Sequence, residues 1–186
     1  MTTIVGIAGS LRKASFNASL LRAAASLMPA DSTLSIGTIR GIPLYDGDVE
    51  AQGIPAPVNA LKDAVAAADG LLLVTPEYNN SMPGVFKNAI DWLSRPSADI
   101  KRVFGDLPVA LIGASPGGFG TILAQSAWLP VLRTLGTQFW SPGRLLVSRA
   151  GQVFAADGTL TDDKVREQLR SLLQDFVAFV RSSPRR

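Results

Sequence analysis

Short apolar runs rich in Val, Ile and Leu alternate with helical patterns along the whole chain. The apolar runs are residues 3–8, 33–39, 71–75, 108–114 and 138–148. Apolar residues recur with helical spacing in residues 17–28, in residues 57–68, behind Pro83, up to Leu135 and from Thr161 onward. Strands that alternate with helices pair in parallel and are covered by helices on both faces. The sequence therefore predicts an α/β fold built on a five-stranded parallel sheet.

Local breaks in this pattern predict the connections. Pro142 and Gly143 interrupt the run 138–148, which is predicted as the fifth strand. Residues 96–106 are predicted to form a surface connection, and Asp157-Gly158 predicts a tight turn within a small hairpin. None of these features disturbs the alternation of strands and helices.

The length of 186 residues favours one well-buried domain, residues 1–186, over two. No apolar run is long enough to cross a bilayer, and the first residues lack the charged start and apolar segment of a secretion signal. We therefore expect a cytoplasmic protein without a membrane partner.

The chain contains no cysteine and no histidine. Disulfides, thiolate nucleophiles and cysteine metal sites are excluded, and the commonest general base and metal ligand is missing, so we expect no metal site. The net charge of +3 comes from scattered basic residues, apart from Arg181, Arg185 and Arg186 near the end. Such scatter does not predict a nucleic-acid surface. An enzyme of this composition depends on carboxylates, hydroxyls, lysine or a cofactor.

The loop after the first strand has the composition of a phosphate-binding loop. It reads Gly9-Ser10-Leu11-Arg12-Lys13-Ala14-Ser15-Phe16-Asn17 and leads into a helix, whose N-terminus favours anions. Ser10, Ser15 and Asn17 are possible hydrogen-bond donors, and Arg12 suits a phosphate with two parallel bonds. Neither G-x-G-x-x-G nor Gly-Lys-Ser/Thr is present, which favours a mononucleotide. The structural alternative is a serine-rich turn capped by Asn17.

Two further loops follow the third and fourth strands, at the sheet edge where ligands bind in parallel α/β folds. Residues 75–84 combine an aromatic ring, amides and open backbone, which suits a flat heterocycle; alternatively they form a polar turn with Tyr78 over the core. Residues 115–120 contain three glycines, which allow close approach of backbone to a ligand or form a flexible connection.

Taken together, these motifs resemble those of the flavodoxin-like NAD(P)H-dependent FMN reductase family, which includes chromate and quinone reductases. The similarity is carried by residues 9–17, by 75–79 with Pro83-Gly84, and by the run Lys87-Asn88-Ala89-Ile90-Asp91-Trp92-Leu93-Ser94. It covers most of the chain and weakens beyond Gly120. The combination of the first loop with P-E-Y-N and K-N-A-I-D-W is more specific than any glycine pattern.

The resemblance implies a flavodoxin-like three-layer sandwich with strand order 2-1-3-4-5, non-covalent FMN, NAD(P)H as co-substrate and a homodimer or homotetramer. It implies three groups of cofactor-binding residues. Those around the FMN phosphate are Ser10, Arg12, Ser15, Phe16 and Asn17; those lining the flavin are Pro76, Glu77, Tyr78 and Asn79; those closing its other side are Ser115, Gly117 and Gly118.

The implied function is an oxidoreductase that passes hydride from NAD(P)H through FMN to quinones or similar acceptors, such as azo compounds, chromate or free flavin. No catalytic side chain is assigned, because the flavin supplies the redox chemistry. Two alternatives stay open: an FMN-binding electron carrier without its own NAD(P)H turnover, and a flavin-free regulatory protein. No motif distinguishes NADH from NADPH.

Other positions depart from the family pattern or carry separate hypotheses. Many members have glycine then arginine early in the fourth helix, where this chain has Thr121-Ile122-Leu123, and Asn80 stands where relatives often have tyrosine. Lys87 and Asp91 are predicted to form an ion pair one helical turn apart, and Trp92 to pack in the core or at an interface. Tyr45 is a candidate to reach a neighbouring subunit's flavin site.

Overall fold

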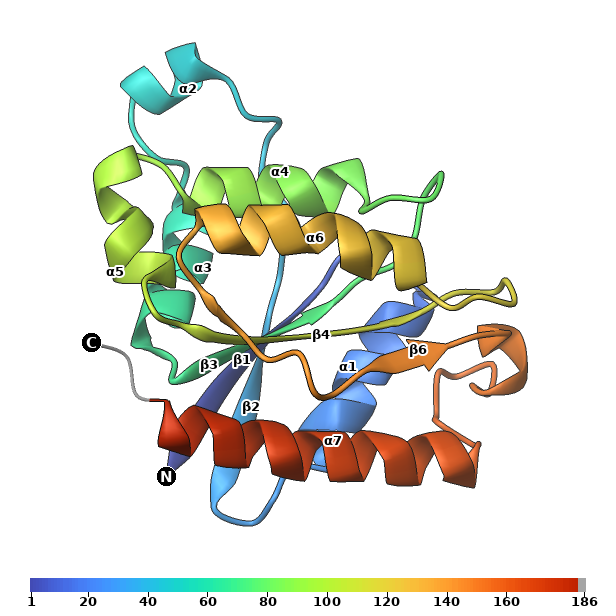
Figure 1. Cartoon of the computed structure of the whole chain (residues 1–186). Helices are drawn as coiled ribbons and strands as arrows, with labels where there is room; N and C mark the ends of the chain where they lie inside the picture. The colour runs from blue at the N-terminus through green and yellow to red at the C-terminus, as the bar shows by residue number, and fades with distance from the viewer. Residues whose placement is uncertain (184–186) are drawn as a thin grey trace.

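The computed structural model describes residues 1–183, so Arg185 and Arg186 lie outside the described residues. Its centre is a sheet in the order β2-β1-β3-β4-β5, and β6 also pairs with β4 (Figure 1). All of these strands run parallel. The predicted α/β class and the strand order 2-1-3-4-5 are therefore confirmed.

The strands agree closely with the apolar runs of the sequence. Their bounds are β1 Thr2–Ala8, β2 Ser32–Gly37, β3 Gly70–Val74, β4 Pro108–Ala114, β5 Gln138–Phe139 and β6 Leu145–Val147. The helices are α1 Phe16–Ser26, α2 Gly47–Ala51, α3 Ala56–Ala67, α4 Gly84–Leu93, α5 Ile100–Phe104, α6 Ile122–Thr134 and α7 Asp163–Ser182, with short 3-10 helices η1 Ser97–Asp99 and η2 Ala150–Gln152.

The sheet is covered on both faces because successive side chains of a strand point to opposite sides. In β3, Leu71 and Leu73 join the core formed with α3, α4, α5 and α6. Leu72 and Val74 join the core formed with α1 and α7. Figure 1 shows these two helical layers above and below the sheet. The result is the three-layer sandwich that the resemblance implies.

The predicted fifth strand is divided into two short strands. β5 pairs with β4 at Pro108 and Val109, whereas β6 pairs with β4 at Ile112, Gly113 and Ala114. Pro142 lies between them and has no N–H to donate to a ladder. The interruption that the sequence predicts therefore separates two segments that pair with the same neighbouring strand.

Residues 96–106 are not a simple surface connection, so this prediction was wrong. The segment contains η1 and α5, and Val103 and Phe104 are fully buried. Three apolar residues, Ile100, Val103 and Phe104, in a short stretch with two basic residues give too weak a periodic signal to reveal a one-turn helix. Lys62 of α3 contributes to this packing, because its buried ammonium binds the Arg95 carbonyl and the Asp99 carboxylate.

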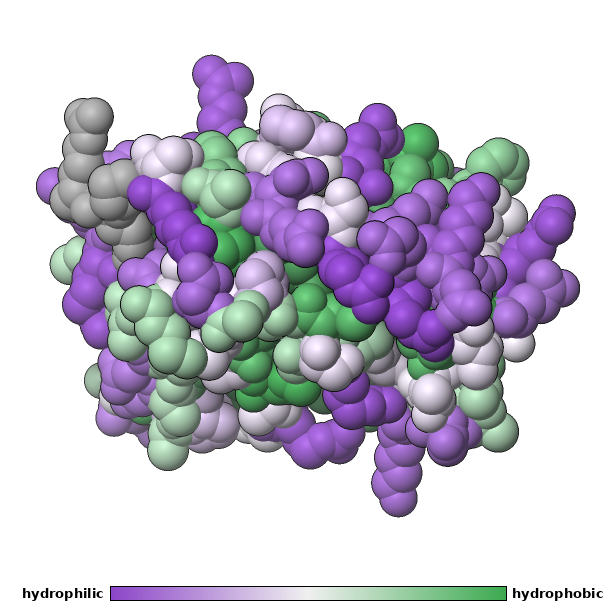
Figure 2. Space-filling model, turned by 90° about the horizontal axis from the view of Figure 1, so that it is seen from below, coloured by the Kyte–Doolittle hydropathy of each residue, from purple (hydrophilic) through white to green (hydrophobic). Residues whose placement is uncertain are grey.

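The predicted turn at Asp157-Gly158 is present. Phe154 and Leu160 form an isolated antiparallel bridge, and Gly158 has φ of 86°, a conformation that glycine adopts without a Cβ clash. Figure 2 views the molecule from the α7 side and shows hydrophilic side chains over much of that face, with hydrophobic surface between them. Within residues 1–183, no helix is both long and apolar enough to cross a membrane.

Candidate functional site

The parallel topology places three loops side by side at one edge of the sheet. They follow β1, β3 and β4, which are adjacent strands in the order β1-β3-β4. Two backbone hydrogen bonds continue the ladder into the loops: Gly9 N–H donates to the Val74 carbonyl, and Thr75 N–H donates to the Ile112 carbonyl, each at 2.9 Å. The carboxyl ends of these strands, and the three predicted site loops, therefore form one continuous rim.

The first loop presents the open N-terminus of α1 to this rim. The Ser15 hydroxyl caps the helix by accepting from the Ala18 N–H at 3.2 Å. Within the described residues, no acceptor is found for the N–H groups of Phe16 and Asn17. The Arg12 side chain is exposed and forms no ion pair there. The loop thus offers unpaired donors and a positive charge to an anion.

Asn17 connects the first loop to the end of β4. Its side-chain amide donates to the Ala114 carbonyl at 2.8 Å and accepts from the Ala114 N–H at 2.9 Å. The residue is only 3% exposed. This two-way bond makes Asn17 a structural link between two site loops, and leaves its backbone N–H, rather than its carboxamide oxygen, for a ligand.

The second loop is a tight reversal that presents Tyr78. Tyr78 and Ser81 exchange two backbone hydrogen bonds of 3.0 Å, and Asn79 and Asn80 between them have φ values of 50° and 61°. Positive φ at both central residues is typical of a type I′ turn, for which asparagine is well suited. Tyr78 is 46% exposed at the tip, so it does not serve as the lid over the core of the alternative interpretation.

Glu77 connects the second loop to α6, the helix that follows the third loop. Its Oε2 accepts from the N–H groups of Leu123 and Ala124, at 2.9 and 3.0 Å, at the start of α6. A carboxylate in this position accepts from two N–H groups that have no partner within the helix. Its negative charge also interacts favourably with the positive end of the helix dipole. The sequence assigns Glu77 only to the flavin; its role as a long-range helix cap has no sequence signal.

The third loop is exposed in the middle and anchored at its ends. The Ser115 hydroxyl donates to the Gly120 carbonyl at 2.5 Å, and the Gly117 carbonyl accepts from the Arg149 N–H at 2.9 Å. A Cβ added to Gly118 would meet nothing within 4 Å. The loop backbone is therefore open to a ligand, and hydrogen bonds within the loop and to Arg149 hold it in place.

Sequence analysis missed the buried residues that support the rim. Beneath Gly9, a Cβ would come within 2.1 Å of the buried Phe86 ring, and that ring packs edge-on against Trp128. The Trp128 indole N–H donates to the Thr75 hydroxyl at 3.1 Å, directly below the second loop. These aromatic residues are typical of any apolar core, so the sequence does not distinguish them from ordinary packing.

The K-N-A-I-D-W segment has a structural role. The ion pair predicted between Lys87 and Asp91 is present at 2.7 Å, and Trp92 is fully buried. The Pro43 carbonyl accepts from the Asn88 amide and from the Trp92 indole, at 2.8 and 2.9 Å. α4 therefore fixes the connection that follows β2.

Tyr45 also packs against this helix within its own chain. Its ring meets Trp92 edge-on with centroids 5.0 Å apart, and its hydroxyl donates to the Glu50 carboxylate at 2.8 Å. That hydrogen bond is the main cause that raises the Tyr45 pKa above its usual value. These contacts lie within one chain and leave Tyr45 40% exposed, so its role at a neighbouring subunit's flavin site stays a prediction.

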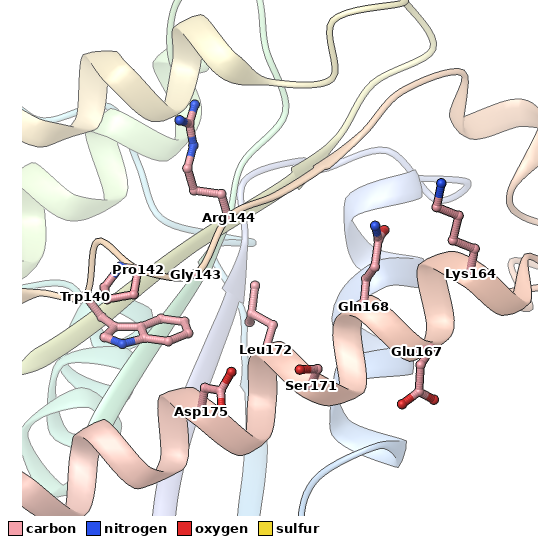
Figure 3. Close-up of a pocket in the computed structure, with 10 residues that line it drawn as sticks. All are labelled: Trp140, Pro142, Gly143, Arg144, Lys164, Glu167, Gln168, Ser171, Leu172 and Asp175. Atoms are coloured by element: carbon pink, nitrogen blue, oxygen red, sulfur yellow. The ribbon is translucent and has the colours of Figure 1, made fainter.

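A separate groove lies between α7 and the β5–β6 connection (Figure 3). It has a volume of about 740 Å³, with Trp140 and Leu172 among its lining residues. None of the predicted site residues lines it. The rim, which carries all the predicted site residues, therefore remains the candidate functional site.

The fold is that of an α/β protein with a parallel sheet, and ligands of such proteins bind at the carboxyl edge, where the three candidate loops meet. Residues 2–152 match the model of the family described as NADPH-dependent FMN reductase. The chain belongs to this family and is a flavin-dependent oxidoreductase with FMN as its cofactor and NAD(P)H as co-substrate. The family suggested by the motifs is confirmed.

Individual relatives extend this similarity to nearly the whole chain. An NAD(P)H-dependent FMN reductase from Pseudomonas aeruginosa is 43% identical over 178 residues, 96% of this chain and 95% of the relative. A 2-hydroxy-1,4-benzoquinone reductase from Burkholderia sp. is 40% identical over 178 residues, which are 96% of this chain and 96% of the relative. The structure of FerB, a flavoenzyme NAD(P)H:(acceptor) oxidoreductase from Paracoccus denitrificans, superposes with a TM-score of 0.88 at 34% identity, covering 99% of this chain and 100% of FerB.

Proposed function

We propose that residues 1–186 form one FMN-binding domain that uses NAD(P)H to reduce quinones or similar small acceptors. The observation that carries the proposal is the meeting of three loops at one rim, with unpaired N–H groups at the start of α1. The name of the Burkholderia relative supports a quinone as acceptor, and that of the Paracoccus flavoenzyme supports electron transfer from NAD(P)H to an acceptor. FMN supplies two-electron redox chemistry when bound, which suits a chain without cysteine or histidine.

The first loop would hold the phosphate of FMN. The N–H groups of Phe16 and Asn17 and the hydroxyls of Ser10 and Ser15 are available as neutral donors, and Arg12 adds a charged one. Hydroxyl and guanidinium donors beside a helix N-terminus fit a dianionic phosphate. The residues present therefore fit the cofactor of the family.

The other two loops would hold the flavin ring mainly through backbone. Pro76, Tyr78 and Asn79 would lie on one side of the ring, and Ser115, Gly117 and Gly118 on the other. Within the described residues, the backbone N–H groups of Asn79, Gly117 and Gly118 have no hydrogen-bond partner and are available to a ligand, whereas those of Tyr78 and Ser115 are already bonded. Backbone N–H and C=O groups match a heterocycle that has donors and acceptors along its edge. In this proposal, Glu77 fixes the distance between the loops by capping α6.

Steady-state turnover tests this function against the electron-carrier alternative. The purified FMN-loaded protein is mixed with NADPH or NADH and menadione, and nicotinamide oxidation is followed at 340 nm. We expect multiple turnovers without any added reductase. Oxidation that requires a separate reductase would favour the carrier, and protein that takes up no added FMN would favour the flavin-free alternative.

Replacement of Arg12 tests the phosphate assignment. Arg12→Ala is expected to weaken FMN binding by about 1.5–3 kcal/mol, or more than tenfold, because charge-assisted hydrogen bonds to the phosphate are lost. Flavin fluorescence titration of the apoprotein gives the dissociation constant. Arg133→Ala, which removes an exposed arginine from α6, is the matched control and should leave the constant unchanged. Equal affinities of the Arg12→Ala and control proteins would refute the assignment.

We further propose a cytoplasmic homodimer or homotetramer. Phe119, in the third loop, is 83% exposed, and Leu123, at the start of α6, is 46% exposed. Large apolar side chains at a rim are favourable contacts for a second copy of the chain. Light scattering at micromolar concentration distinguishes these states from a monomer.

A further inference from the structure

A positively charged hollow adjoins the first loop on the side of α1 and α7. It has a volume of about 650 Å³ and lies between the stretch from Arg12 to Arg22 and the segment 151–158. Because Arg12 and Phe16 line it, the hollow is continuous with the proposed phosphate loop. The sequence places its two walls more than a hundred residues apart in the chain and gives no indication that they meet.

The walls of the hollow are well defined. Phe16 and Phe154 stack with ring centroids 6.0 Å apart and an angle of 24° between the planes, which provides an apolar floor. The hairpin tip packs closely on α1, since a Cβ on Gly158 would lie 2.5 Å from the Ser19 hydroxyl and 2.8 Å from the Arg22 guanidinium. The hollow is therefore a formed cavity between packed elements.

Its charge is unbalanced in favour of cations. Arg12, Lys13 and Arg22 line it, and in the described part of the chain none of them forms an ion pair. Among residues 1–183, Arg22 donates only to the Ser19 hydroxyl, at 2.9 Å. The one carboxylate in the lining is Asp157, which accepts from the Thr159 N–H at 2.8 Å. That bond lowers the Asp157 pKa, so three cations face one carboxylate at neutral pH.

Exposed cations are usually just solvated, but cations that converge on one concave surface concentrate the field there and favour a bound anion. With Arg12 assigned to the phosphate of FMN, Lys13 and Arg22 are left for a second anionic group. The other phosphate-bearing reactant of the proposed function is the nicotinamide dinucleotide. NADPH differs from NADH by the 2′-phosphate on its adenosine.

Resting on that proposed function, we infer that this hollow binds the adenosine 2′-phosphate end of NADPH. Lys13 and Arg22 bind the phosphate, and the Phe16–Phe154 floor carries the apolar surface of the adenosine. The hollow then makes the protein prefer NADPH over NADH, since removing a charged ligand group leaves both cations without a partner.

The experiment uses the FMN-loaded protein with the variants Lys13→Gln, Arg22→Gln and their combination, and Arg133→Gln as the exposed control. Isothermal titration measures binding of adenosine 2′,5′-bisphosphate and of 5′-AMP. We expect the bisphosphate to bind the unaltered protein at least about tenfold more tightly, and the combined variant to lose that difference. In turnover, the KM for NADPH should rise about tenfold while the KM for NADH changes less than about twofold.

Several results would overturn the inference. These are equal binding of the two nucleotides by the unaltered protein, a bisphosphate preference that survives in the combined variant, or a loss of FMN affinity in Lys13→Gln and Arg22→Gln, which would assign the hollow to the cofactor. Lys13→Gln lies in an exposed loop and keeps the test valid should Arg22→Gln disturb the hairpin. The titration decides the inference even if the protein oxidises neither nicotinamide, a result that would refute the proposed function separately.

Discussion

Gly113→Ala is expected to lower the free energy of unfolding by about 3 kcal/mol, the upper part of the range for overpacking a core. A Cβ at this position of β4 would lie 2.2 Å from the Thr75 carbonyl oxygen and 2.1 Å from the Thr121 hydroxyl. Both neighbours are fully buried, and one is backbone of the adjacent strand end, so neither has space to move aside. Relief requires that the second and third loops separate, and we therefore expect FMN affinity to fall as well.

Urea unfolding followed by circular dichroism measures the stability change in the apoprotein. Gly84→Ala is the matched control, since a Cβ there meets nothing within 4 Å at the first residue of α4. That control should keep or slightly raise stability, because alanine is the better helix former. A Gly113→Ala protein as stable as the Gly84→Ala protein would show that the contact of β4 with Thr75 and Thr121 is not as close as described.

Asn17→Ala is expected to destabilise the protein by about 2–4 kcal/mol, because the Ala114 N–H and carbonyl lose their partner in a buried position. The same bonds hold the start of α1 against the end of β4. FMN binding should weaken too, although the Asn17 carboxamide is already engaged within the protein.

Two further variants test this interpretation of Asn17. Asn59→Ala removes an exposed amide that donates to the Ile54 carbonyl, and it should lower the free energy of unfolding only slightly. Asn17→Asp keeps the acceptor for the Ala114 N–H but places a carboxylate against the Ala114 carbonyl, so it should be at least as unstable as Asn17→Ala near neutral pH. A stable Asn17→Ala protein with lowered FMN affinity would instead make Asn17 a direct ligand.

The sheet was predictable because its strands are continuous apolar runs, as expected for strands buried on both faces. The alternation of Leu71, Leu72, Leu73 and Val74 between two cores explains why no polar residue appears there. The one-turn helix α5 escaped prediction, since five residues offer too few turns for periodicity.

The candidate site was predictable as loops but not as contacts. Strand ends locate the rim, and residue types such as those of the first loop indicate the ligand class. The bonds of Asn17 to Ala114 and of Glu77 to α6 join residues far apart in the chain, and no local pattern specifies them. The charged hollow was not predictable for the same reason, because the hairpin around Gly158 contacts α1 only in the folded chain.

The most direct test of the central claim compares FMN with riboflavin, which lacks only the phosphate. Both are titrated into the apoprotein, and their dissociation constants are measured by flavin fluorescence. If the loop between β1 and α1 holds the phosphate, FMN should bind about a hundredfold more tightly, and Arg12→Ala should reduce that ratio by more than tenfold. Equal binding of FMN and riboflavin, or a ratio unaffected by Arg12→Ala, would contradict the account.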